Sequence, residues 1–273
     1  MSIRIHARFL AVALAGTIAV AACGGGSGSG GATTGGAAEP AAPAAAPAPT
    51  PNATADGPGV ITGKISYDGA PPGRQVVRMG ADPACMPSGD GPVLSEVTIV
   101  GDSGGLQNVF VHVKEGLGDK VYARPTTPVV LDQVGCMYQP HVFGVFVGQP
   151  VEIRNSDSTL HNVHAIPKDN EEFNFGQQNN KVPPTVKTFD KPEIGLSFRC
   201  DVHGWMRAYA NVVTHPFFAV TKDDGTFEIK GLPPGTYTIE TWHERLGLQT
   251  QQVTIDAAKP KAEANFSYKP AAS

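Results

Sequence analysis

Charged residues are scarce in this sequence, since Asp, Glu, Lys and Arg make up only 17% of the 273 residues. Glycine and proline are abundant instead, with 32 and 24 residues, respectively. This composition excludes a coiled coil and favours a loop-rich β protein. The formal net charge is −4, so the chain lacks the excess of positive charge that nucleic-acid-binding proteins carry. We therefore expect no nucleic-acid partner.

Acidic residues are absent before Glu39, and the chain begins with a pattern typical of exported proteins. Residues 1–22 combine two arginines with a nearly unbroken run of small and branched apolar residues, which indicates a signal peptide and is too short for a membrane span. The run ends in Val20-Ala21-Ala22-Cys23, which resembles the lipobox of bacterial lipoproteins. The resemblance implies that Cys23 is lipidated and becomes the first mature residue. The alternative is an ordinary cleavage site beside a chance cysteine.

Gly24 rather than Asp follows this cysteine, which by the same resemblance implies sorting to the outer membrane. We therefore expect a lipid-anchored protein of the cell envelope, on the periplasmic side of a membrane. Of the 21 basic residues, Arg4 and Arg8 would leave with the signal peptide, so 19 would remain against 25 acidic residues. The mature chain would then carry a net charge of −6.

Aromatic residues are missing from residues 24–58, where 9 Gly, 11 Ala and 6 Pro account for most positions. Such a stretch cannot bury enough apolar surface to offset the entropy lost on ordering it. Residues 23–58 are therefore expected to form a disordered tether between the lipid and the folded part of the chain.

From Gly59 onward, no segment has an apolar period of 3.6 residues over three turns. Alternation with a period of two recurs about every ten residues instead, and Gly and Pro separate the alternating segments. This pattern predicts an all-β chain, and the remaining length of about 210 residues suits two small sandwiches better than one. The predicted strands are 60–67, 93–100, 107–113, 142–147, 150–155, 195–200, 207–213, 226–230, 235–242 and 248–255.

Cysteine is also rare, with four residues in the chain. If Cys23 is lipidated, three remain, and an odd number leaves one thiol without a disulfide partner. Cys200, His203 and Met206 follow one another at steps of three, and His161 lies 39 residues upstream. Thiolate, imidazole and thioether together select copper or another soft ion over magnesium or calcium.

These motifs resemble those of the cupredoxins, the blue-copper electron carriers, and within that family the amicyanin type. The C-x-x-H-x-x-M spacing, the H-N-V-H segment at 161–164 and the strand ending in Asn155 agree, so the resemblance covers roughly residues 136–214. It implies a Greek-key β-sandwich that binds one type 1 copper ion. The implied ligands are His161, Cys200, His203 and Met206, with Asn162 tying the His161 segment to the ligand loop near the sulfur.

The resemblance further implies that the ring edge of His203 reaches the surface within an apolar docking patch. Trp205 would then contact a redox protein partner, such as a cytochrome or a dehydrogenase. The alternative, given equal weight, is that Trp205 is a core residue under the ligand loop. With Cys23 lipidated and Cys200 on copper, Cys85 and Cys136 are the two cysteines left. We expect them to form a disulfide in an oxidising compartment, the alternative being two buried free thiols.

The remaining histidines lack a soft partner at ligand spacing. His164 lies three residues after His161 and so points to the opposite face of an extended strand. We expect it to be a structural or surface histidine. The same expectation holds for His112, His141, His215 and His243.

A second module is indicated on both sides of the copper motifs. The Asp224-Gly225 and Pro233-Pro234-Gly235 turns around an alternating strand resemble a hairpin of the carboxypeptidase regulatory-like, transthyretin-type sandwiches. The segments 61–69 and 106–113 resemble the early strands of that family. Neither flank contains a full sandwich, so we predict a discontinuous regulatory-like sandwich made of residues 59–130 and 217–273, into which a cupredoxin-like domain, residues 131–216, is inserted.

The leading hypothesis is a lipid-anchored electron carrier rather than an enzyme, because the regulatory-like segments carry no nucleophile, paired carboxylates or phosphate loop. Tracts rich in methionine or histidine, common in copper-trafficking proteins, are absent, and the chain has only five methionines. Two alternatives remain, a copper delivery or sequestration protein and a metal-free structural protein of the cell surface.

Overall fold

The computed structural model describes residues 50–80, 82–87, 89 and 91–270. The predicted signal peptide, the predicted lipidation site Cys23 and the part of the predicted tether before residue 50 lie outside the described residues. Within the described residues, the chain forms strands and a single 3₁₀ turn, η1 (Pro83–Cys85), which confirms the all-β fold class. No helix in this part of the chain is long and apolar enough to cross a membrane.

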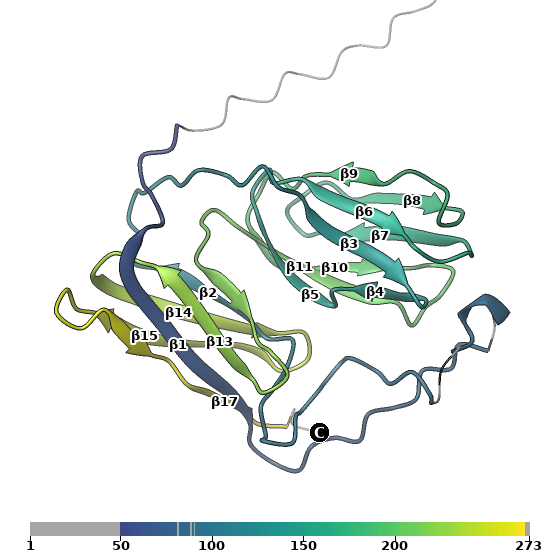
Figure 1. Cartoon of the computed structure of the whole chain (residues 1–273), viewed down its shortest axis with the longest axis horizontal. Coiled ribbons are helices and arrows are strands. Elements are labelled where there is room, and N and C mark those ends of the chain that lie inside the picture. The colour runs from purple at the N-terminus through teal and green to yellow at the C-terminus, as the bar shows by residue number, and fades with distance from the viewer. Residues whose placement is uncertain (1–49, 81, 88, 90, 271–273) are drawn as a thin grey trace, which may run out of the picture. The chain divides into compact units, whose positions relative to one another are not determined.

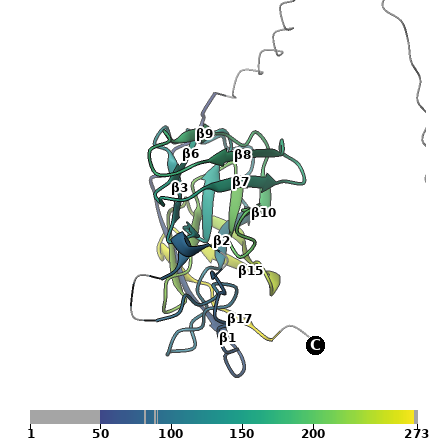
Figure 2. The ribbon, with the colours of Figure 1, turned by 90° about the vertical axis from the view of Figure 1, so that its right-hand side faces the viewer.

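The strands follow one another in short steps along the chain and assemble into four sheets (Figures 1 and 2). In chain order they are β1 (Gly57–Tyr67), β2 (Phe110–Glu115), β3 (Val129–Val134), β4 (Met137–Gln139), β5 (Val142–Phe146), β6 (Val151–Asn155), β7 (His161–Ile166), β8 (Phe173–Gln177), β9 (Thr185–Lys187), β10 (Glu193–Arg199), β11 (Arg207–Val213), β12 (Phe218–Val220), β13 (Thr226–Gly231), β14 (Gly235–His243), β15 (Gly247–Ile255), β16 (Lys261–Glu263) and β17 (Phe266–Tyr268).

One sandwich, which we call the discontinuous sandwich, is built from both ends of the folded region. One sheet has the order β13-β1-β16, with β17 also paired to β1, and the other has the order β12-β2-β14-β15. Alternation along β1 buries Ile61 and Ile65, which meet residues such as Val111 and Ile239 of the facing sheet in a shared core. All strand partners of β1 and β2 lie after residue 217, so the sandwich closes only when both ends of the chain meet.

The second sandwich, which we call the inserted sandwich, contains β3 to β11 and interrupts the first between β2 and β12. Its sheets have the orders β5-β11-β10-β7-β8 and β4-β3-β6-β9. Buried residues from both sheets, among them Ile153, Val163 and Phe198, form a core separate from that of the discontinuous sandwich. Figure 1 shows the two groups of strands.

One segment before residue 130 does not belong to the sandwich that was predicted for residues 59–130. Met79 and Cys85 are buried in the core of the inserted sandwich, and a disulfide joins Cys85 to Cys136. This segment therefore packs on the inserted sandwich, although it precedes β2 in the chain. The strand predicted at residues 93–100 is also absent from the structure. Residues 93–95 instead make short backbone contacts with residues 75–77, including a bond from the amide of Val77 to the carbonyl of Val93.

The two sandwiches contact each other through an apolar cluster and through the ion pair between His141 and Glu244. Phe110 of the discontinuous sandwich is buried together with Val142 and Val213 of the inserted sandwich. Gly195 of β10 has a φ angle of +75° and lies so close to Trp242 that a Cβ atom there would be only 2.7 Å from the indole ring. A side chain at this position would thus be strained and would also push the sandwiches apart.

Candidate metal centre

Strand β7 turns His161 into the interior of the inserted sandwich. The strand begins at this residue, and its side chains alternate, so that His161, Val163 and Ala165 are buried while Asn162 and His164 lie on the outer face. Strands β8 and β10 flank β7 on either side. The imidazole of His161 is therefore fully buried, with an exposed fraction of 0%.

The ligand loop, residues 200–206, connects β10 to β11 at the same end of the sandwich. Cys200 continues the buried alternation of Leu196 and Phe198 and so points into the core. The amide of Met206 donates to the carbonyl of His203 at 2.9 Å, and the amide of Cys200 donates to the carbonyl of Met206 at 3.3 Å. These bonds close the loop, with the side chains of all three predicted ligands buried.

The predicted ligands from β7 and from the loop meet at one point. The Nδ1 atoms of His161 and His203 are 2.9 Å apart, and the Sγ atom of Cys200 is 3.9 Å from Nδ1 of His203. The ligand atoms of these three residues all lie within 4.8 Å of one another. Met206 is fully buried in the same core cluster. Three of the four residues predicted from the sequence thus converge, and the fourth, Met206, lies in the same loop and is buried in the core that contains Cys200.

Asn162 ties the His161 strand to the ligand loop. Its Oδ1 atom accepts hydrogen bonds from the amides of Asp201 at 2.6 Å and Val202 at 3.2 Å, and it lies 3.3 Å from the sulfur of Cys200. The amide of His203 donates to the same sulfur at 3.3 Å. Burial alone would raise the pKa of the Cys200 thiol, but hydrogen bonds from His161 and from neighbouring residues outweigh burial and lower this pKa. The site therefore favours the thiolate, the form that binds metal ions.

Each of the two histidines also contacts a carboxylate that the sequence analysis did not identify. Nε2 of His161 lies 2.8 Å from Asp157, and Nε2 of His203 lies 3.1 Å from Asp82. Asp157 additionally accepts the backbone amides of Gly135 and Cys136. Burial alone would raise the pKa of Asp157, but its bonds to His161 and to these amides outweigh burial and lower it. Asp157 precedes His161 by four residues, a spacing that could have been noticed, whereas no local signal marks Asp82.

The protonation of the rings makes the space between them suitable for a cation. A carboxylate only accepts hydrogen bonds, so Nε2 of each histidine carries a hydrogen, and in a neutral ring Nδ1 is then an acceptor. Burial opposes a charge on His161, but the bonds to Asp157 and Cys200 raise its pKa to about 9. A proton on His161 and a metal ion at Nδ1 would therefore compete for the same place. Two imidazoles and a thiolate around one position, with a buried thioether in the same loop, fit copper.

The environment of His203 differs from what the resemblance implies. Its exposed fraction is only 2%, because Asp82 and Cys85 cover the Nε2 side of the ring. Trp205 is half-buried against the same core, its ring centroid lies 5.0 Å from that of His203, and its Nε1 donates to the carbonyl of Cys136 at 3.0 Å. The expectation of an exposed ring edge at His203 is therefore wrong. The disulfide that brings Cys85 to Cys136 places a covering segment there.

The other histidines lie away from this donor set. His164 faces outward and lies between Asp201, at 3.0 Å, and Glu172, at 2.8 Å. Among the described residues, every group of three or more side chains placed to hold a metal ion includes His161 or His203. His112, His141, His215 and His243 are buried, and none of them belongs to such a group.

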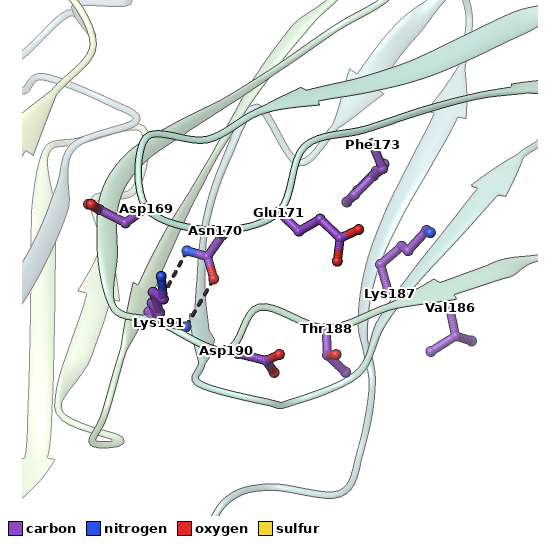
Figure 3. A pocket seen from close by; sticks show the side chains of 9 residues that line it. All are labelled: Asp169, Asn170, Glu171, Phe173, Val186, Lys187, Thr188, Asp190 and Lys191. Atoms are coloured by element: carbon purple, nitrogen blue, oxygen red, sulfur yellow. Dashed lines mark hydrogen bonds between the residues drawn. The ribbon is translucent and has the colours of Figure 1, made fainter. Parts of the chain in front are cut away.

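A surface depression lies elsewhere on the inserted sandwich. Figure 3 shows its lining side chains, which come from the turn before β8, the first residue of β8, β9 and the turn that follows β9. Asn170 bridges the two turns through bonds of 2.9 Å to the backbone of Lys191. No predicted metal ligand lines this depression.

No family model and no curated protein sequence matches the chain. The Cu-containing nitrite reductase (NirK) from Thermus scotoductus SA-01 is 25% identical over 36% of this chain and 24% of its own chain, so this chain spans about a quarter of that enzyme, with a TM-score of 0.30. Amicyanin from Paracoccus versutus is 21% identical over 38% of this chain and 97% of its own, with a TM-score of 0.28. The purple cupredoxin from Nitrosopumilus maritimus is 18% identical over 32% of this chain and 99% of its own, with a TM-score of 0.27. All three overall similarities are weak.

Proposed function

We propose that this protein binds one copper ion in the inserted sandwich and carries single electrons between redox partners. The observation that supports this proposal is the convergence of one ligand atom each from His161, Cys200 and His203 within 4.8 Å of one another, in a core that also buries Met206. These donors match the two imidazoles, one thiolate and weak thioether of electron-transfer copper sites. Copper bound there would supply a one-electron couple.

The residues around the donors keep their arrangement unchanged while an electron arrives or leaves. Asp157 and Asp82 hold the two imidazoles from their outer sides, and the amide of His203 holds the sulfur of Cys200. The donor side chains are almost fully buried, which excludes water from the site. Because little has to move, the energy needed to reorganise the site during electron transfer is small.

We further propose that the protein acts as an electron carrier, not as an enzyme, at the periplasmic side of a membrane. The lipobox-like segment that ends in Cys23 and the residues rich in Gly, Ala and Pro that follow it support a lipid anchor. The partner of this carrier would be another redox protein, such as a cytochrome or a dehydrogenase. Copper delivery and a metal-free structural role are the competing functions.

Titration of the purified protein with Cu(II) tests this function. We expect an intense visible absorption band from charge transfer out of the Cys200 thiolate, bleached by ascorbate and restored on reoxidation. Cys200→Ser should abolish the band, while the matched variant His164→Gln, whose ring lies outside the donor set, should keep it. Copper binding without the band would favour delivery or sequestration, and the absence of binding would favour the structural role.

A further inference from the structure

A short segment that begins at Asp82 and ends at Cys85 covers the outer side of His203. Asp82 Oδ2 lies 3.1 Å from Nε2 of the ring, and the sulfur of Cys85 lies 3.7 Å from the same nitrogen. Asp82 and His203 are 121 residues apart in the chain. The contact therefore exists only because this segment packs onto the inserted sandwich.

The carboxylate of Asp82 accepts two hydrogen bonds in addition to its contact with His203. Its Oδ1 atom accepts the backbone amide of Ala84 at 2.8 Å and so caps the 3₁₀ turn η1 (Pro83–Cys85), visible as the dark blue coil in Figure 2. Its Oδ2 atom accepts the hydroxyl of Thr159 at 2.9 Å. Thr159 precedes His161 by two residues, so one carboxylate links the β7 side of the candidate centre to the loop side.

A covalent bond keeps this segment in place. The Cys85–Cys136 disulfide joins η1 to the turn between β3 and β4, with a Cα–Cα distance of 5.4 Å. The same turn receives the indole hydrogen bond of Trp205 and donates two amides to Asp157. Asp82 can therefore leave His203 only by local rearrangement of a segment that is bonded at both Asp82 and Cys85.

We propose that Asp82 is a positioning residue, which holds His203 by Nε2 so that Nδ1 faces the Cys200 thiolate. This inference rests on the proposed function. The outer torsion of a histidine side chain is broad, so an imidazole without an outer partner samples several orientations. A carboxylate partner fixes the tautomer and the ring orientation and raises the basicity of the metal-binding nitrogen.

Two properties of Asp82 act on the ring and can be separated. Asp82→Asn keeps an oxygen acceptor of the same shape but removes the negative charge, whereas Asp82→Ala removes both. The orientation of the His203 ring depends on the oxygen acceptor, so this orientation should be retained in Asp82→Asn. The electrostatic preference for Cu(II) over Cu(I) depends on the charge, so it should be lost in both variants.

The binding experiment uses the full-length protein and measures the copper affinity, the visible spectrum and the reduction potential. We expect Asp82→Ala to weaken Cu(II) binding by about 10-fold to 100-fold. Asp82→Asn should stay within about 3-fold of the wild type in affinity but should have a higher reduction potential. Thr159→Val, which removes one bond to the carboxylate, should fall between the wild type and Asp82→Ala. Asp119→Asn, at an exposed position with no contact to the site, is the matched control.

A second measurement needs no copper. In metal-free protein, the alkylation rate of Cys200 by iodoacetamide, followed by the mass of its peptide, reports how firmly the site is closed. Cys200 is buried, so alkylation requires local opening, which Asp82→Ala should accelerate by about 10-fold. The double variant Cys85→Ser, Cys136→Ser, which releases the same segment, should accelerate it as well.

The inference would be overturned if Asp82→Ala had the same copper affinity, reduction potential and alkylation rate as the wild type. A loss of affinity in Asp82→Ala matched by Asp82→Asn, with no change in potential, would also overturn it, because a merely structural role would act in this way. Failure of the proposed function is distinct, since the wild type would then show no copper–thiolate band while the alkylation rates would still report on Asp82.

Discussion

The Nδ1 atoms of His161 and His203 lie 2.9 Å apart in the interior of the inserted sandwich, and each ring presents its Nε2 atom to a carboxylate. With both outer nitrogens facing carboxylates, the two inner nitrogens are left to share a hydrogen or to bind a metal ion. The arrangement thus holds a proton or a metal ion at the same place. Competition between the two has a measurable consequence.

Copper binding should release protons. The pKa of His161, raised to about 9, means that its ring carries an extra proton at neutral pH, and a metal ion at Nδ1 must displace it. We expect release of at least about one proton per copper near pH 7, and an apparent affinity that rises with pH until about 9. Calorimetric titration in buffers with different ionisation enthalpies measures this number. An affinity that does not change between about pH 6 and pH 9 would contradict the assignment of His161.

Met206 should tune the potential without creating the colour. In Met206→Gln, an amide oxygen replaces the thioether as a stronger axial donor, so Cu(II) gains stability relative to Cu(I). We expect the copper–thiolate band to persist and the reduction potential to fall, as measured by redox titration. Loss of the band in this variant would show that Met206 supports the fold of the ligand loop more than it tunes the ion.

Trp205 packs between Cys136 and His203, so its removal should cost stability. We expect Trp205→Ala to lower the free energy of unfolding by about 3 kcal/mol and Trp205→Phe, which retains most of the packing but loses the bond to Cys136, by about 1 kcal/mol. Denaturant unfolding measures both values. An unchanged stability in Trp205→Ala, together with slower electron exchange with a redox partner, would favour the docking role instead.

Deletion of residues 217–273 should unfold β1 and β2. These strands have all their sheet partners in the deleted part, so their backbone groups would lose the sheet hydrogen bonds. We expect amide-exchange protection to vanish over residues 57–67 and 110–115 while it persists over 129–213. Protection retained in β1 of the truncated protein would show that the two segments of the discontinuous sandwich fold independently.

His141 should stabilise the contact between the two sandwiches in a pH-dependent way. It lies between Glu244 of the discontinuous sandwich and Glu96, with the ring of Tyr209 against it. Burial lowers the pKa of His141, but the bond to Glu244 and the charges of both glutamates outweigh burial and raise it above the ordinary value. The stabilisation is therefore complete below about pH 6.5 and is lost as pH rises through the raised pKa.

Unfolding of the wild type and His141→Gln over a range of pH tests this contribution. We expect a difference in the free energy of unfolding of about 2 kcal/mol near pH 6 that shrinks above neutral pH. Glu244→Gln should remove the same dependence. A difference that grows with pH would have the wrong sign for a raised histidine pKa.

Local alternation predicted many of the strands, because the side-chain period of a strand is a property of a few consecutive residues. The segments 142–147, 150–155 and 207–213 form β5, β6 and β11 nearly at their predicted positions. Alternation did not predict strands with mixed or polar patterns, such as β8, which contains Asn174 and Gln177, and the short β9. The segment 93–100 has the alternation of a strand, but it finds no continuous partner and does not form one.

The sequence alone was enough to predict the candidate donor set, because Cys200, His203 and Met206 lie within one seven-residue segment and the alternation of β7 decides which histidine faces inward. Hydrogen bonds and packing between distant segments decided the rest. Asp82 reaches His203 across 121 residues, and the Cys85–Cys136 disulfide closes 51 residues to bring it there. No pattern within a few residues records such a contact, so only the tertiary structure shows that a carboxylate holds His203 and that this ring is enclosed.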